Sequence, residues 1–180
     1  MTETLAFGTV DTVLGRLLVA ETETGVVSLT FHDTPAARAR TAKAAGLPVV
    51  DAPDRLAPAL SVLRDYFAGD LKDVEVPIDW RLTSDVQRQV LSTLYDSVPY
   101  GEVVTYGALG DRSGTGVHAQ GVGQVMGANP IPLLVPCHRV VASNGLGGYS
   151  GGSGIETKRW LLTLEGAIPA TLDWDLTRGP

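Results

Sequence analysis

A cysteine and a histidine stand side by side at residues 137 and 138, and Cys137 is the only cysteine in the chain. A cysteine reacts as its thiolate, and a neighbouring imidazole can take the thiol proton or stabilise the anion that remains. The pair of Cys137 and His138 therefore indicates an activated nucleophile. Free cysteines are also among the most buried residue types and often only pack in a core, so the pair alone leaves a structural role open.

The remaining residues do not have the spacing of a metal or cofactor site. A single cysteine excludes an internal disulfide, and the histidines His32, His118 and His138 do not form a zinc-binding pattern. The glycine-rich stretch at residues 145–154 lacks the Gly-Lys-Ser or Gly-Lys-Thr sequence of a phosphate-binding loop. We therefore expect no metal and no cofactor.

The composition predicts a globular, cytoplasmic protein that does not associate with membranes. The 180 residues are 44% hydrophobic and 19% charged, with no run apolar enough to span a bilayer and no basic-then-apolar leader. The net charge is −6, of which residues 1–83 carry −4 and residues 84–166 only −1. The part that contains Cys137 is nearly neutral, whereas proteins that contact nucleic-acid phosphates normally show a cluster of Lys and Arg.

Residues 1–82 have the patterns of a small antiparallel sheet covered by helices. Short runs that alternate apolar and polar residues predict the strands, and apolar residues at helical spacing predict the helices. The expected strands lie at residues 17–20 and 26–31, and the expected helices at residues 36–45 and 56–67. Residues 70–80 alternate as a strand or an extended linker would, which predicts a domain boundary near residue 82.

From Ser84 onward the pattern becomes helical. Ser84 is the expected N-cap of a helix, and Gln87 completes a capping box. A short helix at residues 105–109 that ends at Gly110, a glycine turn at residues 113–116 and a second helix at residues 117–128 have the outline of a helix-turn-helix.

Three glycines interrupt the second of these helices. Gly121, Gly123 and Gly127 each cost up to about 1 kcal/mol relative to alanine in a helix interior. Either another helix packs closely against them, or this helix approaches the backbone of a ligand closely. The sequence leaves both explanations open.

Several motifs together resemble the O6-alkylguanine-DNA alkyltransferase family. They are Asn129-Pro130, the Pro-Cys-His-Arg-Val-Val run at residues 136–141 and the Gly-Tyr-Ser-Gly-Gly run at residues 148–152. The resemblance is strong over residues 84–166, whereas residues 1–82 fit the family's variable N-terminal domain only in outline. It implies a mixed α/β (α+β) fold. Residues 1–82 would form a supporting domain that is ribonuclease H-like in outline, and residues 83–180 a helical domain that binds DNA and accepts the alkyl group.

The resemblance also implies a reaction. Members of this family move an alkyl group from the O6 atom of a damaged guanine in DNA to their own cysteine, once per molecule, and O4-alkylthymine is a further expected substrate. It implies that Cys137 is held by His138, that Glu165 orients the imidazole through water, and that Asn129 braces the turn before an expected cysteine strand. Without the resemblance, Asn129 would be a helix C-cap and Glu165 an exposed carboxylate of the last helix.

A guanine inside a duplex cannot reach a buried sulfur, so the resemblance implies that the nucleotide is flipped into a pocket. Tyr106 corresponds to the tyrosine that helps to rotate the phosphate and donates a hydrogen bond to the leaving guanine. Tyr149 corresponds to a ring that stacks on the base, and Ser150 to a group that meets O6. The Val140 carbonyl corresponds to the acceptor that reads the exocyclic amine.

Four further positions correspond to DNA contacts of the family. Gln87, Thr115 and Ser143 correspond to neutral contacts with phosphates, which can position a duplex without a basic patch. Gln120 stands where the family usually has an arginine that fills the gap left by the flipped base. Because a glutamine lacks the guanidinium charge and plane, we expect weaker DNA binding, or compensation from Arg112 or His118.

The expected partner is double-stranded DNA with an alkylated guanine, bound by a monomer through the minor groove, which suits a helix with small residues. Three other classes of protein are alternatives. A protein that flips the alkylated base and recruits other repair without transfer would not need the cysteine. A cysteine hydrolase would need a distant histidine with its own motif, and a helix-turn-helix regulator would need Arg or Lys on its second helix.

Overall fold

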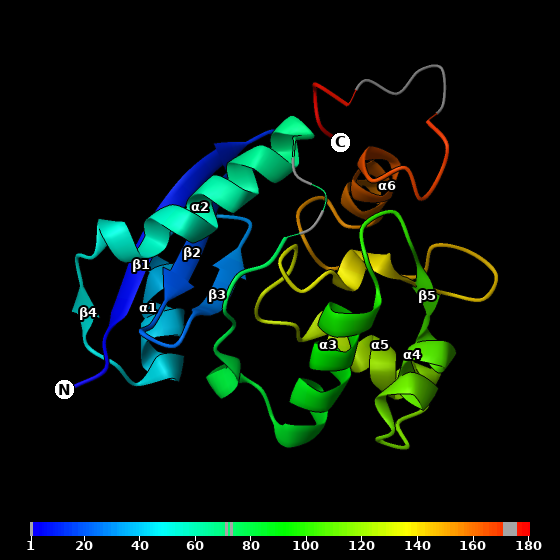
Figure 1. The fold of residues 1–180 in the computed structure, drawn as a ribbon, viewed down its shortest axis with the longest axis horizontal. Helices are drawn as coiled ribbons and strands as arrows, with labels where there is room; N and C mark the ends of the chain where they lie inside the picture. The colour runs from blue at the N-terminus through cyan, green and yellow to red at the C-terminus, as the bar shows by residue number, and fades with distance from the viewer. Residues whose placement is uncertain (1, 71, 73, 171–175) are drawn as a thin grey trace. The chain divides into compact units, whose positions relative to one another are not determined.

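The computed structural model describes residues 2–70, 72, 74–170 and 176–180. The chain divides into two compact units, Met1–Leu82 and Thr83–Pro180 (Figure 1). The first unit combines a sheet with two helices, and the second is mainly helical. None of the helices in the described residues is long and apolar enough to cross a membrane.

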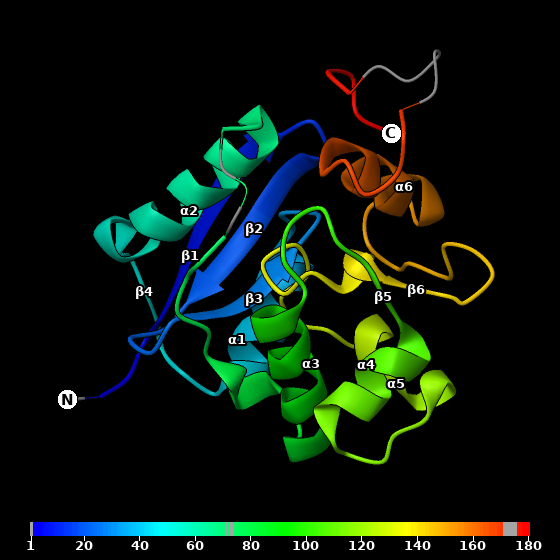
Figure 2. The ribbon, with the colours of Figure 1, turned by 45° about the vertical axis from the view of Figure 1, so that its right-hand side comes forward.

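A four-stranded sheet with the strand order β3-β2-β1-β4 organises the first unit. The strands β1 (Leu5–Thr12), β2 (Gly15–Glu21) and β3 (Val26–Thr30) are antiparallel. The two predicted strands correspond to β2 and β3, whereas β1 adds a strand that the sequence analysis does not name. The two-residue strand β4 (Val49–Val50) pairs with β1 in parallel, which the sequence does not predict. The predicted helices are present as α1 (Pro35–Ala45) and α2 (Pro53–Ala68), and α2 lies along β1 and β2 (Figure 2).

Those of residues 70–80 that the structure describes do not add a strand to the sheet. Ile78 forms a single bridge with Val26, and the 3-10 turn η1 (Trp80–Leu82) ends the unit. The buried carboxylate of Asp79 accepts hydrogen bonds from Thr22 Oγ1 and Arg81 Nε, both at 2.6 Å. Charge-assisted hydrogen bonds of this kind are stronger than neutral ones, so Asp79 fixes the end of the first unit against its own sheet.

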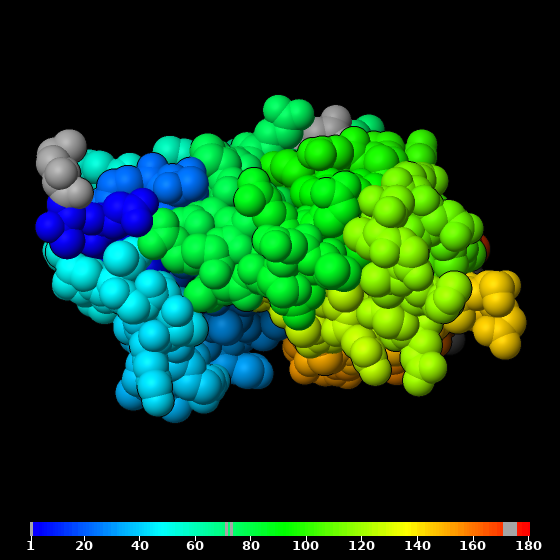
Figure 3. Space-filling view, turned by 90° about the horizontal axis from the view of Figure 1, so that it is seen from below, coloured from blue at the N-terminus to red at the C-terminus, as the bar shows by residue number. Residues whose placement is uncertain are grey.

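The helices α3 (Asp85–Ser97), α4 (Tyr106–Ser113) and α5 (Ala119–Gly127) pack on one another in the second unit. Their outer surfaces, green to yellow-green, are seen together in Figure 3. The parallel pair β5 (Val104–Thr105) and β6 (Val140–Val141), the 3-10 turn η2 (Cys137–Arg139) and α6 (Ile155–Leu164) complete this unit. The structure thus has the predicted mixed α/β fold with a helix-turn-helix formed by α4 and α5.

The ends of these helices follow from local chemistry. The capping box at the start of α3 is confirmed, because Gln87 Oε1 accepts from the Ser84 backbone at 2.9 Å and Ser84 Oγ from that of Gln87 at 3.3 Å. The prediction that the first helix of the motif ends at Gly110 is wrong. Gly110 lies inside α4, where a Cβ atom would lie only 2.4 Å from the Val117 carbonyl oxygen. The helix ends one turn later, at Gly114, whose φ of +68° suits glycine.

The cysteine lies on a 3-10 turn and not on the expected strand. The segment that leads to it contains Leu133, whose φ of +70° is the only positive value outside glycine among the described residues. The turn η2 starts at Cys137, and β6 begins only at Val140. The side chain of Cys137 can therefore turn toward the helix-turn-helix instead of alternating across a sheet.

Candidate active site

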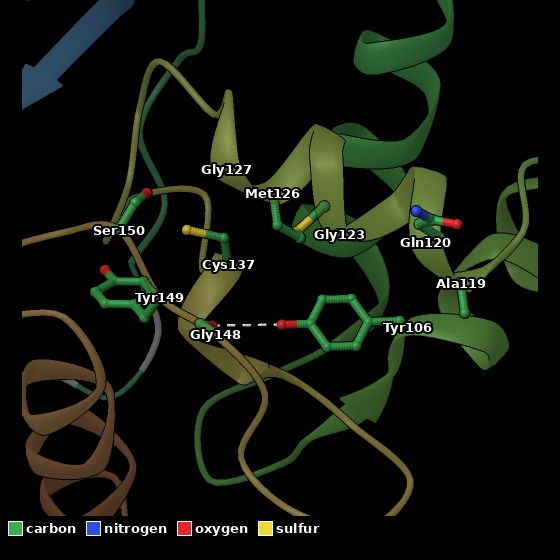
Figure 4. Close-up of a pocket in the computed structure, with 10 residues that line it drawn as sticks. All are labelled: Tyr106, Ala119, Gln120, Gly123, Met126, Gly127, Cys137, Gly148, Tyr149 and Ser150. Atoms are coloured by element: carbon green, nitrogen blue, oxygen red, sulfur yellow. Dashed lines mark hydrogen bonds between the residues drawn. The ribbon is translucent and has the colours of Figure 1, made fainter.

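A pocket of about 630 Å³ lies entirely within the second unit (Figure 4). It is formed by α4, α5, η2 and the loop between β6 and α6. Its volume is in the range that holds a small organic ligand. The lining residues are Tyr106, Ala119, Gln120, Gly123, Met126, Gly127, Cys137, Gly148, Tyr149 and Ser150.

Two of the three glycines of α5 line this pocket. A Cβ atom on Gly123 would lie 3.9 Å from the Tyr106 ring, and a Cβ atom on Gly127 would meet nothing within 4 Å. Gly121 does not line the pocket, and a Cβ atom there would lie 2.6 Å from the side chain of Val117. Of the two explanations for these glycines, the close approach of a ligand therefore fits Gly123 and Gly127, and tight packing within the unit fits Gly121.

Cys137 is buried, with 5% of its surface exposed, and its sulfur points into the pocket (Figure 4). Burial raises the pKa of the Cys137 thiol, while hydrogen bonds with Asn129 and Tyr149 and the positive charge of Lys158 act in the opposite direction. The thiol therefore keeps its proton at neutral pH until a base removes it.

Asn129 joins the end of the helix-turn-helix to the segment that leads to the cysteine. Its Nδ2 donates to the Val135 carbonyl at 2.9 Å, and its Oδ1 accepts from the Ile131 backbone at 3.0 Å. Both side-chain polar groups are thus used to fix the backbone just before Cys137. Substituting Asn129 would leave buried backbone groups without partners.

His138, Arg139 and Glu165 form a buried cluster next to Cys137. Glu165 follows α6 and is 5% exposed, so it is not the exposed carboxylate that its position at a helix end suggests. Its Oε1 lies 2.7 Å from His138 Nε2. The contact is therefore direct, and the distance leaves no room for the expected water between the two side chains. Arg139 donates to both carboxylate oxygens, at 2.8 and 3.0 Å.

The charges in this cluster fix the protonation state of the carboxylate. Burial by itself raises the pKa of Glu165, but it is outweighed by the positive charge that His138 carries when protonated, by the hydrogen bonds from His138 and Arg139 and by the charge of Arg139, which together hold that pKa well below its usual range. A neutral His138 that donates through Nε2 to Glu165 has a lone pair on Nδ1. His138 Nδ1 is buried and has no hydrogen-bond partner among the described residues. This nitrogen is therefore the candidate base of the site.

Tyr106 is the first residue of α4, and its ring forms one wall of the pocket (Figure 4). Its hydroxyl donates to the Gly148 carbonyl at 3.4 Å and accepts from Lys158 Nζ at 3.4 Å. The loop passes so close to this ring that a Cβ atom on Gly147 would lie 2.8 Å from the hydroxyl oxygen. Gly147 also has a φ of +73°, which favours glycine.

The loop that carries Tyr149 and Ser150 closes another side of the pocket, and both residues line it. The Val140 carbonyl, expected to read the exocyclic amine, accepts a hydrogen bond from Lys158 Nζ at 2.6 Å. Val140 is fully buried in strand β6 and is not among the residues that line the pocket.

Comparisons with known proteins agree on one family. Residues 85–167 match the model of the 6-O-methylguanine DNA methyltransferase DNA binding domain, and residues 5–80 match that of the ribonuclease-like domain. A Mycolicibacterium paratuberculosis protein named methylated-DNA–protein-cysteine methyltransferase is 35% identical over 89% of this chain and 92% of its own length. The chain belongs to this methyltransferase family.

Further relatives support the assignment of the chain to the methyltransferase family. The Mycobacterium bovis protein of the same name is 44% identical over 63% of this chain and 67% of its own length. The crystal structure of Mycobacterium tuberculosis OGT in complex with DNA matches with a TM-score of 0.74 at 34% identity, covering 90% of this chain and 93% of that one.

The positions expected to contact DNA lie on the helix-turn-helix and around it. Gln120, on α5, is exposed and also lines the pocket, so it is the only one of the four that the structure brings to the cysteine. Gln87 is at the start of α3, where its amide oxygen is engaged in the capping box. Thr115 lies in the turn between α4 and α5, with its hydroxyl 2.9 Å from Ser113 Oγ, and Ser143 is exposed after β6.

The two side chains expected to compensate for Gln120, those of Arg112 and His118, differ in their hydrogen bonding in this methyltransferase. Arg112 Nη1 donates to the backbone carbonyl and the hydroxyl of Ser97, at 3.2 and 3.1 Å, so its guanidinium is partly used at the end of α3. His118 is the exposed N-cap residue of α5 and makes no side-chain capping hydrogen bond. Of the two, His118 is the better placed to meet DNA beside Gln120.

Two buried cations of the site were not predicted from the sequence. Arg139 balances Glu165 and also donates to the Val98 carbonyl at 2.9 Å. Lys158, on α6, has no exposed surface and contacts Tyr106. The available signal was spacing, because Lys158 lies three and four residues before the buried Leu161 and Leu162 and so shares their helix face. The described residues contain no group of His, Cys, Asp and Glu that could hold a metal ion.

Proposed function

We propose that this chain repairs DNA by direct damage reversal, moving the alkyl group of O6-alkylguanine to Cys137 in a single turnover. The observation that carries this function is the burial of the only thiol of the chain inside a pocket, beside the His138–Glu165 pair and the glycine-containing face of α5. Membership of the methyltransferase family supports the same reaction.

The transfer follows from the arrangement of the cluster. His138 Nδ1, whose ring is oriented by Glu165, takes the thiol proton, and the imidazolium that forms is stabilised by the carboxylate. The sulfur then attacks the saturated alkyl carbon, the S–C bond forms, and the bond between that carbon and O6 breaks with its electron pair remaining on guanine. The thioether product is not reversed by thiol exchange, so each molecule acts once.

The pocket residues divide the recognition of the flipped base. The Tyr149 ring stacks on the base and Ser150 donates a hydrogen bond to O6. The Val140 carbonyl, which also accepts from Lys158, accepts from the exocyclic amine. Tyr106 donates to the leaving guanine. The same pocket accepts O4-alkylthymine, which presents a comparable alkylated oxygen.

The chain binds double-stranded DNA as a monomer, with α5 in the minor groove and Gln120 in the gap left by the flipped base. The pocket opens beside α5, where glycines allow the close approach that a narrow groove requires. Gln87, Thr115 and Ser143 contact phosphates. Residues 83–180 carry binding and transfer, residues 1–82 support them, and a cytoplasmic location remains our prediction.

The alternative of a protein that only binds and flips the lesion is not favoured, because such a protein would not need a cysteine, whereas Cys137 lines the pocket. The reaction is tested by incubating the protein with an oligonucleotide that carries O6-methylguanine and determining the mass of the peptide that contains Cys137. A gain of one methyl group, absent in Cys137→Ala, is expected. Binding of the lesion without a gain in mass would establish the alternative.

A further inference from the structure

Lys158 is a buried ammonium surrounded by uncharged acceptors. Its Nζ donates to the Val140 carbonyl at 2.6 Å, to the Gly148 carbonyl at 3.0 Å and to the Tyr106 hydroxyl at 3.4 Å. Nζ also lies 5.6 Å from the centre of the Tyr106 ring. In the part of the chain that the structure describes, Lys158 forms no ion pair.

The two buried cations of the site therefore differ in their balance of charge. Arg139 is neutralised by both oxygens of Glu165, whereas the charge of Lys158 is not neutralised by any carboxylate of the described residues. Taking an ammonium out of water without a counter-charge is costly. A positive charge kept behind the pocket wall at this cost stabilises negative charge that forms in the pocket during the reaction.

Lys158 is also poised to release a proton. Burial lowers its pKa from 10.5 to about 8, against the opposing effect of a negative charge on Cys137. The titratable groups that face it are Tyr106 of α4 and Cys137 of η2. The charged neighbours on its own helix, Glu156 and Arg159, are exposed and lie 3.8 Å from each other.

The Tyr106 hydroxyl links this ammonium to the pocket. It accepts from Lys158 and donates its own proton to the Gly148 carbonyl at 3.4 Å, a long contact. When a base enters the pocket, the hydroxyl proton can turn from this carbonyl to the base while the bond from Lys158 is kept. The two groups are therefore arranged in series, from Lys158 through Tyr106 to the ligand.

We propose that Lys158 is a positioning residue of the transfer reaction, which orients the Tyr106 hydroxyl and replaces the proton that Tyr106 gives to the departing guanine. This inference rests on the alkyl transfer proposed above. As the bond between O6 and the alkyl carbon breaks, guanine keeps the electron pair. It takes a proton from the Tyr106 hydroxyl, and Tyr106 takes one from the Lys158 ammonium. The products are neutral guanine, an intact tyrosine and a neutral amine.

The experiment measures single-turnover methyl transfer from an O6-methylguanine oligonucleotide, with the melting temperature of every variant recorded. Lys158→Met is expected to slow transfer on the order of 100-fold, the scale of a proton-transfer contribution. Arg159→Met is the matched control, because Arg159 is the next residue of α6 and is exposed. It is expected to leave the rate unchanged.

Two further readouts separate the proton relay from a role as a structural clamp. In the Tyr106→Phe background, Lys158→Met is expected to change the rate less than about threefold, because the relay is already broken. Lys158→Arg keeps the positive charge and the hydrogen-bond donors, but a guanidinium does not release its proton near pH 8. The ratio of the wild-type rate to the Lys158→Arg rate is therefore expected to fall above about pH 8, where the wild-type ammonium loses its proton.

The relay is wrong if Lys158→Met slows the Tyr106→Phe protein as much as the wild type, or if the rate ratio is constant with pH. If Lys158→Met does not fold, the ratio for Lys158→Arg decides alone. Failure of the relay leaves methylation of Cys137 by the wild-type protein intact. The absence of that methylation would instead refute the proposed function.

Discussion

Substituting Glu165 by glutamine tests the buried cluster next to Cys137. The carboxylate holds His138 Nε2 at 2.7 Å and both donors of Arg139 at 2.8 and 3.0 Å, with the glutamate and histidine side chains fully buried. Glu165→Gln removes the only negative charge that neutralises Arg139 in this cluster. Leaving one partner of a buried pair uncompensated costs about 3–5 kcal/mol.

The assay is urea unfolding of the wild type, Glu165→Gln and the matched control Glu156→Gln. Glu156 is also on α6, but it is exposed and lies 3.8 Å from Arg159, so its substitution is expected to cost less than about 1 kcal/mol. A loss of about 3–5 kcal/mol in Glu165→Gln corresponds to a melting temperature lower by roughly 6–20 °C for a protein of this size.

The stability difference between the wild type and Glu165→Gln is expected to decrease in acid. The pKa of Glu165 is lowered in the folded state, so its stabilisation is present above the unfolded value of about 4.3 and is lost as the pH falls below it. The difference in stability between the wild type and Glu165→Gln is therefore expected to narrow as the pH falls from neutral to 3. A difference below about 1 kcal/mol at pH 7, or one that does not narrow in acid, would refute the role of Glu165 as the counter-charge of Arg139.

Two other substitutions test the DNA face and the pocket loop. Gln120→Arg adds a positive charge beside the pocket of a chain with a net charge of −6. It is expected to tighten DNA binding roughly tenfold and to make the affinity depend more steeply on salt concentration. If a salt titration finds both the affinity and the repair rate unchanged, Gln120 does not limit DNA binding. Gly147→Ala strains a φ of +73° and places a methyl group 2.8 Å from the Tyr106 hydroxyl oxygen, so transfer is expected to slow about tenfold or more. Gly145→Ala, with nothing within 4 Å and no positive φ, is its control, and equal rates for the two variants would count against the loop contact.

Features governed by neighbouring residues could be predicted from the sequence. The capping box of Ser84 and Gln87 is local, and the structure has both of its hydrogen bonds. The predicted end of α4 was wrong because glycine is typical of helix ends. At Gly110 the absence of a side chain instead allows the backbone of Val117 to lie close to the helix. The parallel strand β4 has only two residues, too few to show a period.

The candidate site was harder to predict, because it depends on contacts between residues that are distant in sequence. The adjacent Cys137 and His138 indicated the nucleophile, and the resemblance added Glu165. The direct contact between His138 and Glu165, 27 positions apart, required the fold. Arg139 and Lys158 were missed because a charged residue is normally exposed. Their burial follows from partners contributed by other elements, namely the Val98 carbonyl for Arg139 and the Val140 carbonyl for Lys158.

The central claim is that Cys137 is a consumable acceptor, and counting the alkyl groups that one molecule accepts tests it most directly. Because Cys137 is the only cysteine, the mass of the intact protein can be followed as an oligonucleotide with O6-methylguanine is added in excess. We expect that each chain gains one methyl group, that no more lesions are repaired than chains are present, and that Cys137→Ser gains none. Repair of many lesions per chain, or binding with no gain in mass, would contradict it.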